Sequence, residues 1–438
     1  MRIGTRSRSW AAVSALLVIG TMGTAQNQPV ASSSVPVSLD VPGRVDASPW
    51  IAASGSFVAV AWGATADSKT DVFLAVSRDG GGTFGPPVRV NRVAGEARLG
   101  GELPPRVALT ARRGAAVPEV VVLWTAAGGT TAIKIARSRD GGSTFGAPVT
   151  LQSPAALGDR GWPAVAVDSR ATAHAIWLDH RGMAVKPGAG GKAHTGHQAG
   201  SGHGSTGMAE QSALYYASQS PARTSRERQL TTGVCYCCKT ALAAGPDGSL
   251  YAAWRHVYPG NFRDMAFSVS RDAGRSFSAP VRVSEDGWAI NGCPDDGPAM
   301  AVDARGTAHL VWPTVIPGAT PQGALYYAST RDGRRFTARL RIPTLGGPRP
   351  AHPQIVIDGG GRIVVAWDEI VNGRRVAAAR ELKLRGEGPP VFGDTVMLSP
   401  DGGAIYYPVL AATDTGIVAV WTRVGDASRV EVQRLRIP

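Results

Sequence analysis

An all-β fold built from a repeated four-stranded unit is predicted by three features of the sequence. The octapeptide at residues 77–84 recurs in almost the same form at 138–145 and 270–277, with a looser copy at 330–336. A tryptophan ends a strand-like run seven times, and helical periodicity is nearly absent. Because a chain repeats a local motif where it repeats the surrounding unit, these copies indicate a repeat architecture. The seven tryptophans are Trp62, Trp124, Trp177, Trp254, Trp312, Trp367 and Trp421.

Each unit begins with a predicted hairpin. Residues 163–168 and 173–177 are two short runs of small and β-branched residues on either side of a turn. A third strand such as 324–329 follows a variable loop, and a fourth such as 280–284 follows the octapeptide. Four antiparallel strands per unit, repeated around a ring, make a β-propeller. The tryptophan count predicts seven blades.

The octapeptides, called octets below, are predicted to be turns between the third and fourth strands. The side chain of Asp79 can accept hydrogen bonds from amides of its own turn, the glycines allow positive φ, and Phe84 can bury against neighbouring strands. This pattern, Ser-x-Asp-x-Gly-x-Thr/Ser-Phe, resembles the Asp box of the sialidase and BNR-repeat superfamily. The resemblance covers nearly the whole chain after its N-terminal segment and implies a propeller. Sialidases have six blades, so six is the alternative to seven.

The seventh unit stops at Pro438 after its third predicted strand. We therefore expect residues 35–41 to supply the missing outer strand and to close the ring. This arrangement makes residues 26–438 a single propeller domain.

The first 25 residues have the layout of a cleavable secretory signal. Arg2, Arg6 and Arg8 precede an apolar run at 11–19, and small residues precede Gln26. That run is too short to span a bilayer. We expect a periplasmic or extracellular protein, in which disulfides are permitted.

The chain carries a formal net charge of +13, mostly from arginine. Such a charge suits a glycan or another small anionic ligand, although scattered arginines also occur as solvated surface groups. No helix-turn-helix, zinc-finger or aromatic RNA-binding signature is present, so nucleic acid is not expected as a partner. The sequence leaves the oligomeric state open.

The geometry of a blade sorts the turns onto two faces. Turns between strands one and two and between strands three and four, including the octets, lie on one face, which we call the octet face. The loop between strands two and three and the link to the next blade lie on the opposite face, which we call the loop face. Any site at the mouth of the ring is therefore expected on the loop face. All four cysteines fall in links on this face, before the first strands of two neighbouring blades: Cys235, Cys237, Cys238 and Cys293.

The four cysteines allow two interpretations. They can form two disulfides, with the least strained connectivities joining the 235–238 segment to Cys293. Alternatively they can form a thiolate site for copper or, less favoured, zinc, since Cys-x-Cys-Cys gathers soft ligands in one loop. A glycine-rich insertion at 181–211 on the same face could add ligands, or could be a surface excursion. The histidines predicted to assist a metal are His194, His197, His203 and His256.

Carboxylates beside arginines on the loop face suit glycoside chemistry, in which one group protonates the leaving oxygen and another stabilises an oxocarbenium-like state. Solvated loop charges give the same pattern. The residues predicted to be catalytic are Arg160, Asp179, Arg181, Arg255, Asp368 and Glu369.

The resemblance implies an exo-sialidase type of glycoside hydrolase, but it carries over no catalytic residue. Sialidases hold the substrate carboxylate with three arginines, the first in a Phe/Tyr-Arg-Ile-Pro motif before the first Asp box. Only Arg44 precedes that box after the signal segment, and the Arg-Ile-Pro tripeptides at 341–343 and 436–438 lie late in the chain.

Three functional hypotheses follow. The first is an exported propeller that binds or hydrolyses glycans at the loop face. The second is a copper- or zinc-binding propeller for metal handling or redox catalysis. The third is an interaction platform without catalysis, since a fold alone does not fix a function.

Overall fold

The computed structural model describes residues 1, 30–31, 35–111, 114–154, 156–183, 205–386, 388–398, 403–425 and 427–438. Residues 2–25 of the expected signal lie outside this part of the chain. So do residues 184–204 of the insertion, with His194, His197 and His203. Within the described ranges, no helix is both long enough and apolar enough to cross a bilayer.

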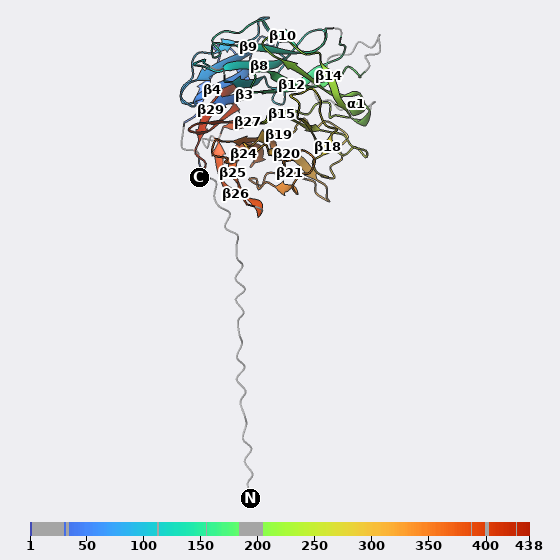
Figure 1. The fold of residues 1–438 in the computed structure, drawn as a ribbon. Helices are drawn as coiled ribbons and strands as arrows, with labels where there is room; N and C mark the ends of the chain where they lie inside the picture. The colour runs from blue at the N-terminus through green and yellow to red at the C-terminus, as the bar shows by residue number, and fades with distance from the viewer. Residues whose placement is uncertain are drawn as a thin grey trace.

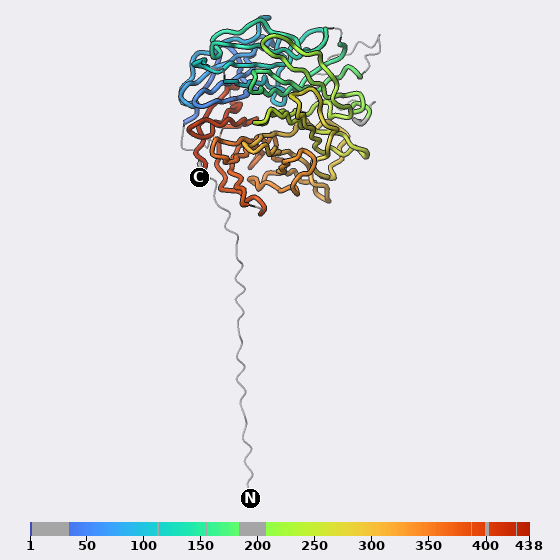
Figure 2. Tube along the Cα trace, in the orientation of Figure 1, coloured from blue at the N-terminus to red at the C-terminus, as the bar shows by residue number. Residues whose placement is uncertain are grey.

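The described chain forms seven antiparallel sheets arranged as a ring (Figure 1), which confirms the all-β seven-blade propeller and excludes the six-blade alternative. In the tube view the blue N-terminal blades lie beside the red C-terminal ones (Figure 2).

The strands of the first four blades, from the innermost outwards, are as follows. Blade 1 contains β3 (Val45–Ser54), β4 (Phe57–Ala66), β5 (Lys69–Ser77) and β6 (Val88–Arg89). Blade 2 contains β7 (Arg106–Thr110), β8 (Glu119–Ala126), β9 (Ala132–Ser138) and β10 (Val149–Thr150). Blade 3 contains β11 (Arg160–Val167), β12 (Ala173–Asp179), β13 (Ala213–Gln219) and β14 (Arg228–Thr232). Blade 4 contains β15 (Ala241–Ala244), β16 (Leu250–Arg255), β17 (Met265–Ser270) and β18 (Val281–Arg282).

The remaining blades complete the ring. Blade 5 contains β19 (Ala299–Val302), β20 (Ala308–Ile316), β21 (Gln322–Thr330) and β22 (Leu340–Arg341). Blade 6 contains β23 (Ala351–Ile357), β24 (Ile363–Val371), β25 (Arg374–Arg385) and β26 (Gly388–Leu398), to which β1 (Val30–Ala31) adds in parallel. Blade 7 contains β27 (Ala404–Thr413), β28 (Gly416–Val424), β29 (Arg429–Leu435) and β2 (Val37–Leu39). The helix α1 (Ser205–Gln211) lies in the connection between β12 and β13.

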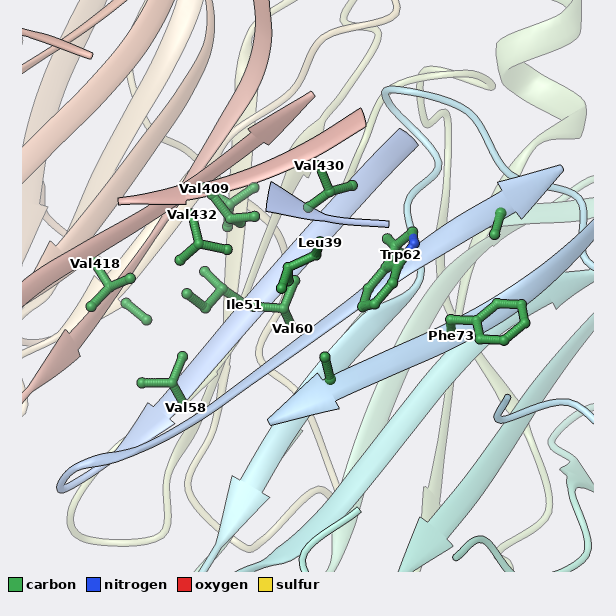
Figure 3. Close-up of a cluster of buried hydrophobic side chains, with 14 residues drawn as sticks. Leu39, Ile51, Val58, Val60, Trp62, Phe73, Val409, Val418, Val430 and Val432 are labelled. Carbon is green, nitrogen blue, oxygen red and sulfur yellow. The ribbon is translucent and has the colours of Figure 1, made fainter. Parts of the chain in front are cut away.

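Strand β2 confirms the predicted closure, because it pairs antiparallel with β29 as the outer strand of blade 7. Leu39 of this strand is buried in a cluster that joins blade 7 to blade 1. Figure 3 shows it among side chains of both blades, including Ile51, Val60 and Val430. Segments from near the two ends of the chain, β2 and β29, are thus paired in one blade.

Six further clusters of the same kind each lie between two neighbouring blades. A single blade cannot bury both of its faces, so each blade depends on its two neighbours. The apolar core is therefore a circle of inter-blade layers.

Shortening a buried side chain of the closing strand β2 should lower the stability of the ring. We expect Leu39→Ala to lower the free energy of unfolding by about 3 kcal/mol, because it removes a buried side chain from the layer between blades 7 and 1. Urea unfolding measures the change. The matched control is Val35→Ala, whose side chain is exposed. Equal stability of the two variants would contradict a contribution of β2 to ring stability.

The octets are turns between the third and fourth strands, as predicted. In the first of them Asp79 accepts hydrogen bonds from the amides of Gly82 and Thr83 at 2.9 and 3.0 Å and from the Thr83 hydroxyl at 2.8 Å. A hydrogen bond from the Ser77 hydroxyl, together with these bonds, lowers the pKa of Asp79. Asp140 and Asp272 likewise accept hydrogen bonds from the amide and the hydroxyl of Thr144 and Ser276, respectively. The octet is a self-contained turn.

Each blade tryptophan is fully buried, and five of the indole N–H groups donate to a buried carboxylate. Trp177 donates to Asp179 at 3.1 Å, and Trp367 donates to Glu369 at 2.7 Å. The pairing satisfies a donor that burial would otherwise leave without a partner. The other carboxylates of this kind are Asp46, Asp286 and Glu431.

Candidate functional site

Four of the innermost strands begin on the loop face with a register shift. In each of them one residue that is not glycine has positive φ. Such residues are strained and persist where the surrounding structure holds them, often beside functional sites. They are Ser48, Trp162, His352 and Tyr407, with φ of 58°, 51°, 53° and 56°.

His352 is the centre of a group of side chains from four blades. Its Nδ1 lies 2.7 Å from an oxygen of Asp368, and its Nε2 lies 3.1 Å from Glu102 Oε1. Its backbone amide donates to Asp296 Oδ2 at 2.6 Å, and its ring packs on Tyr407 with the centroids 4.1 Å apart. The structure thus brings carboxylates of blades 5 and 6 and of the link before blade 2 to one imidazole.

Lys239 completes this group, and its Nζ lies 3.2 Å from Asp296 Oδ1. We call Glu102, Lys239, Asp296, His352 and Asp368 the mouth cluster. A Cβ at Gly297 would lie 2.1 Å from the carbonyl oxygen of Lys239, so glycine is required there. The links before blades 4 and 5 therefore approach one another closely.

Asp368 holds His352 in place from the second strand of blade 6. Its Oδ2 accepts the backbone amide of Tyr407 at 2.8 Å, and its other oxygen accepts a hydrogen bond from Arg375. Because Asp368 is fully buried and has these partners, it stays aligned with the imidazole. It fixes the orientation of the ring.

The environment moves the pKa values of Glu102 and Asp296 apart. Burial raises the pKa of Glu102 to about 7, and the negative charge of Asp296 adds to this rise. Burial also acts to raise the pKa of Asp296, but the Lys239 ammonium and His352 outweigh it, so this pKa falls. Near neutral pH, Glu102 exchanges a proton while Asp296 stays ionised.

The pKa of His352 is raised. Burial acts to lower it, but the carboxylates of Asp368 and Glu102 outweigh burial. Glu102, Asp296 and His352 also offer atoms within 4.8 Å of one another, a spacing that a metal ion could use. The raised pKa of His352 and the positive charge of Lys239 disfavour a cation there, so the group suits proton transfer better than metal binding.

Arg106 lies beside Glu102 on the loop face. Its guanidinium stacks on Trp50 at 3.6 Å from the ring centroid, and its Nε donates to the Pro163 carbonyl at 2.9 Å. Burial lowers the pKa of Arg106 to about 9. Its Nη2 is buried and has no hydrogen-bond partner within the described residues. This leaves a donor for an anionic group.

The cysteines gather next to the mouth cluster, and Cys237 and Cys293 form a disulfide between the links before blades 4 and 5. This is one of the pairings that the sequence allows. Cys235 and Cys238 are free thiols, fully buried, with their sulfurs 2.6 Å apart. Arg263 Nη1 lies 3.7 Å from Cys235 Sγ.

The pKa values of the two free thiols also move apart. Burial acts to raise the pKa of Cys235. The hydrogen bond that the Cys238 thiol donates to it and the charges of Arg263 and Arg255 outweigh burial and lower this pKa to about 7. Burial raises the pKa of Cys238 well above its usual value. Cys235 is the thiol that ionises first.

Four of the residues predicted from the sequence to be catalytic fall into two groups. Asp368 belongs to the mouth cluster. Arg160, Asp179 and Arg181 form a separate set, in which Arg160 Nε and Arg181 Nε contact Asp179 at 3.1 and 2.8 Å. The remaining Arg160 nitrogens donate to backbone carbonyls. These contacts join blades 2 and 3 away from His352.

The other candidates also have structural contacts. Arg255 is buried and donates to the backbone carbonyls of Asp296, Arg263 and Pro313 at 2.7–3.1 Å. Glu369 accepts hydrogen bonds from the backbone amides of Leu345 and Gly347, in addition to the one from the Trp367 indole. A catalytic role of these two residues stays a prediction.

His256 of the predicted metal set is buried, and burial lowers its pKa to about 4. Its Nδ1 accepts the Trp254 indole N–H at 3.4 Å. Near these links, the potential metal ligands whose atoms lie within 4.8 Å of one another are Cys235, Cys237 and Cys293. His256 is not part of this group.

Sequence reasoning did not select Lys239, Asp296 or His352 as site residues, and it missed Glu102 and Arg375. Glu102 lies in the link before the first strand of blade 2, and links of this kind were already expected to build the mouth. A signal was therefore available in the position of Glu102. Arg375 lies in the third strand of blade 6, and nothing in the local sequence marks it as a partner of Asp368.

Comparisons with known proteins show the fold. No protein-family model matches the chain, and no curated protein matches it. A solved ulvan lyase of polysaccharide lyase family PL25 superposes with a TM-score of 0.58 at 10% identity, covering 92% of this chain and 96% of that one. The polysaccharide lyase Uly1 gives 0.52 at 11% identity, covering 95% and 94%. A protein of unknown function from Dyadobacter fermentans DSM 18053 gives 0.50 at 14% identity, covering 92% and 98%. The sialidase and BNR resemblance itself stays a prediction.

Proposed function

We propose that the protein hydrolyses an acidic glycan at the mouth cluster. The observation that carries this proposal is the pair Glu102 and Asp296. Oxygens of the two carboxyls lie within 4.8 Å of one another, and their pKa values move in opposite directions. Environments that separate two carboxyl pKa values assign the acid and the base. The short separation suits a retaining outcome.

In the reaction, protonated Glu102 gives its proton to the glycosidic oxygen as the bond to the anomeric carbon breaks. The ionised Asp296 stabilises the positive charge that develops on the sugar ring. Water then adds to the anomeric carbon and returns its proton to Glu102. The products are two free hydroxyl ends, so one water is consumed for each bond.

Cationic side chains around the pair favour a sugar that carries an anionic group. The unpartnered Nη2 of Arg106 is one donor for such a group, and the Lys239 ammonium is another positive charge at the mouth. His352 stays oriented by Asp368. The ulvan lyase and Uly1 propellers, which share this fold, are named as polysaccharide lyases, and this supports a glycan as the substrate class.

The experiment uses the full chain on a panel of fluorogenic glycosides and uronate- or sialate-bearing polysaccharides. We expect new reducing ends, with retained configuration of the released anomer in the NMR spectrum. An unsaturated uronate product would show elimination and would overturn hydrolysis. No product from the whole panel would overturn the enzymatic proposal.

A second candidate function is binding of a thiophilic metal ion, copper(I) before zinc, at Cys235 and Cys238. Soft thiolates select copper(I). The two buried sulfurs are adjacent, and Arg263 lies where it can offset the negative charge of a bis-thiolate complex. Binding one copper(I) ion releases the two thiol protons. The bridged Cys237 and Cys293 are not available as thiolates in this arrangement.

For this candidate we expect the anaerobically reduced protein to bind one equivalent of copper(I) in competition with a chromogenic chelator. Cys235→Ser should weaken binding by at least roughly a hundredfold, because one of two thiolate ligands is lost. Tyr236→Phe, in the same link, is the matched control and should bind normally. An intact mass showing both cysteine pairs oxidised in protein from its native compartment would exclude the site.

A further inference from the structure

Blade 3 differs from its neighbours on the octet face, opposite the mouth cluster. Its third and fourth strands, β13 and β14, are joined by residues 220–227, and no octet occurs there. The connection carries Arg223 and Arg226, and Arg228 begins β14. The self-contained turn is thus replaced by a shorter, arginine-rich connection, since the corresponding connections of blades 2 and 4 span residues 139–148 and 271–280.

Next to this connection the surface is hollowed between blades 3 and 4. The hollow has a volume of about 760 Å³, within the usual range for ligand sites. It is bounded by the strand-one to strand-two turns of both blades, by residues 220–227 and by the octet of blade 4. Six arginines line it: Arg170, Arg223, Arg226, Arg228, Arg271 and Arg275.

The three carboxylates of the hollow, Asp168, Asp247 and Asp272, offset only part of the charge of its six arginines. Asp272 is bonded to the amide and hydroxyl of Ser276, and Asp247 is bonded to those of Ser249. These hydrogen bonds lower the pKa values of both aspartates. Asp168 is likewise engaged by the amides of its own turn. The acids are committed to the turns that they stabilise.

Most of the arginines of the hollow are available to bind an anionic ligand. The ion pairs of Arg170 and Arg271 are long, 3.4 Å to Asp168 and 3.9 Å to Asp247, and their side chains are 69% and 51% exposed. Arg271 also donates to the Asp332 carbonyl at 3.2 Å, which leaves its charge without a close carboxylate. Within the described ranges, Arg223, Arg226 and Arg275 form no ion pair. The hollow therefore has an excess of positive charge.

Arg228 forms a fixed wall of the hollow. Its guanidinium stacks on Tyr216 at 4.9 Å and Phe277 at 5.8 Å from the ring centroids, and it donates to the carbonyls of Gly274 and Arg275. Gly274 has a φ of 81°, and a Cβ there would overlap the Tyr216 hydroxyl. The backbone at the base of the hollow is thereby held in one conformation.

We propose that this hollow binds a short stretch of an acidic polysaccharide through its sulfate or carboxylate groups. Guanidinium forks match the paired oxygens of both groups. A nucleic acid is less suited, because single-strand sites need exposed aromatic platforms and Tyr216 is buried. The site is separate from the mouth cluster and does not depend on hydrolysis there.

The test measures anisotropy of a fluorescent heparin hexasaccharide with the full chain. We expect the triple variant Arg223→Gln, Arg226→Gln, Arg271→Gln to weaken binding by about 30-fold, since hydrogen bonds to charged groups are lost. The corresponding Arg→Lys triple should keep part of the affinity. Binding should fall about tenfold from about 50 to 200 mM salt.

Controls separate this site from diffuse charge and from the mouth. Arg139→Gln with Arg305→Gln removes exposed arginines of the same face outside the hollow, and Glu102→Gln alters the mouth; both should leave binding unchanged. Desulfated heparin distinguishes sulfate from carboxylate recognition. Equal weakening by the control pair would overturn the proposal. So would equally tight binding of an oligothymidylate of similar charge.

Discussion

Replacing Glu102 by glutamine should reduce kcat/KM on a responsive glycan by about 10³-fold, since the glutamine amide cannot donate the proton that the leaving oxygen needs. The wild-type rate should fall above pH about 7, because Glu102 must be protonated to act and burial raises its pKa to that value. Asp296 must be ionised, and its pKa is lowered, so the acidic limb should lie below the range of an ordinary aspartate. Initial rates across the pH range measure both limbs.

The matched control is Glu96→Gln, which changes a glutamate of the same link. Glu96 is buried and pairs with Lys134, away from His352. We expect its variant to keep the wild-type rate and the limb near pH 7. A Glu102→Gln variant that retains this limb would assign it to another group and refute Glu102 as the acid.

Removing the disulfide should have the largest effect on stability. We expect the double variant Cys237→Ala, Cys293→Ala to lose about 4 kcal/mol of unfolding free energy, because the bridge closes a loop with a sequence separation of 56 residues. Denaturant unfolding measures this loss. Activity should also fall, since the bridged links carry Lys239 and Asp296 to the mouth.

The comparison variant is Cys235→Ala, Cys238→Ala, which keeps the bridge and removes the two free thiols. Its cost should be limited to lost packing, roughly 2 kcal/mol or less. If both double variants lost the same stability, the cross-link between the links would contribute nothing beyond packing. Intact mass before and after alkylation confirms which pair is oxidised in each protein.

Local patterns in the sequence predicted most of the fold. The octets, the tryptophans and the missing last strand each encode a turn, a strand end or an edge, and such features depend on nearby residues. The cysteines were placed on the correct face for the same reason, since a link belongs to a known position within a blade. The structure confirms these elements and the closure by β2.

The candidate site was predicted only in part. Asp179, Glu369 and Asp368 all follow a blade tryptophan and look alike in sequence. The structure separates them, because Asp179 and Glu369 accept the indole of their own blade whereas Asp368 contacts His352. Which way a buried carboxylate points depends on packing with neighbouring blades. The local pattern does not contain that information.

The sequence by itself determined that this chain is a seven-bladed ring with its links on one face, because each blade is specified by its own short strands and turns. Only the tertiary structure brought Glu102, Asp296 and His352 together, and only it showed the arginine-lined hollow between blades 3 and 4. These residues lie far apart along the chain and become neighbours when the ring closes. Their distances, burial and pKa values therefore come from the packing of one blade against the next.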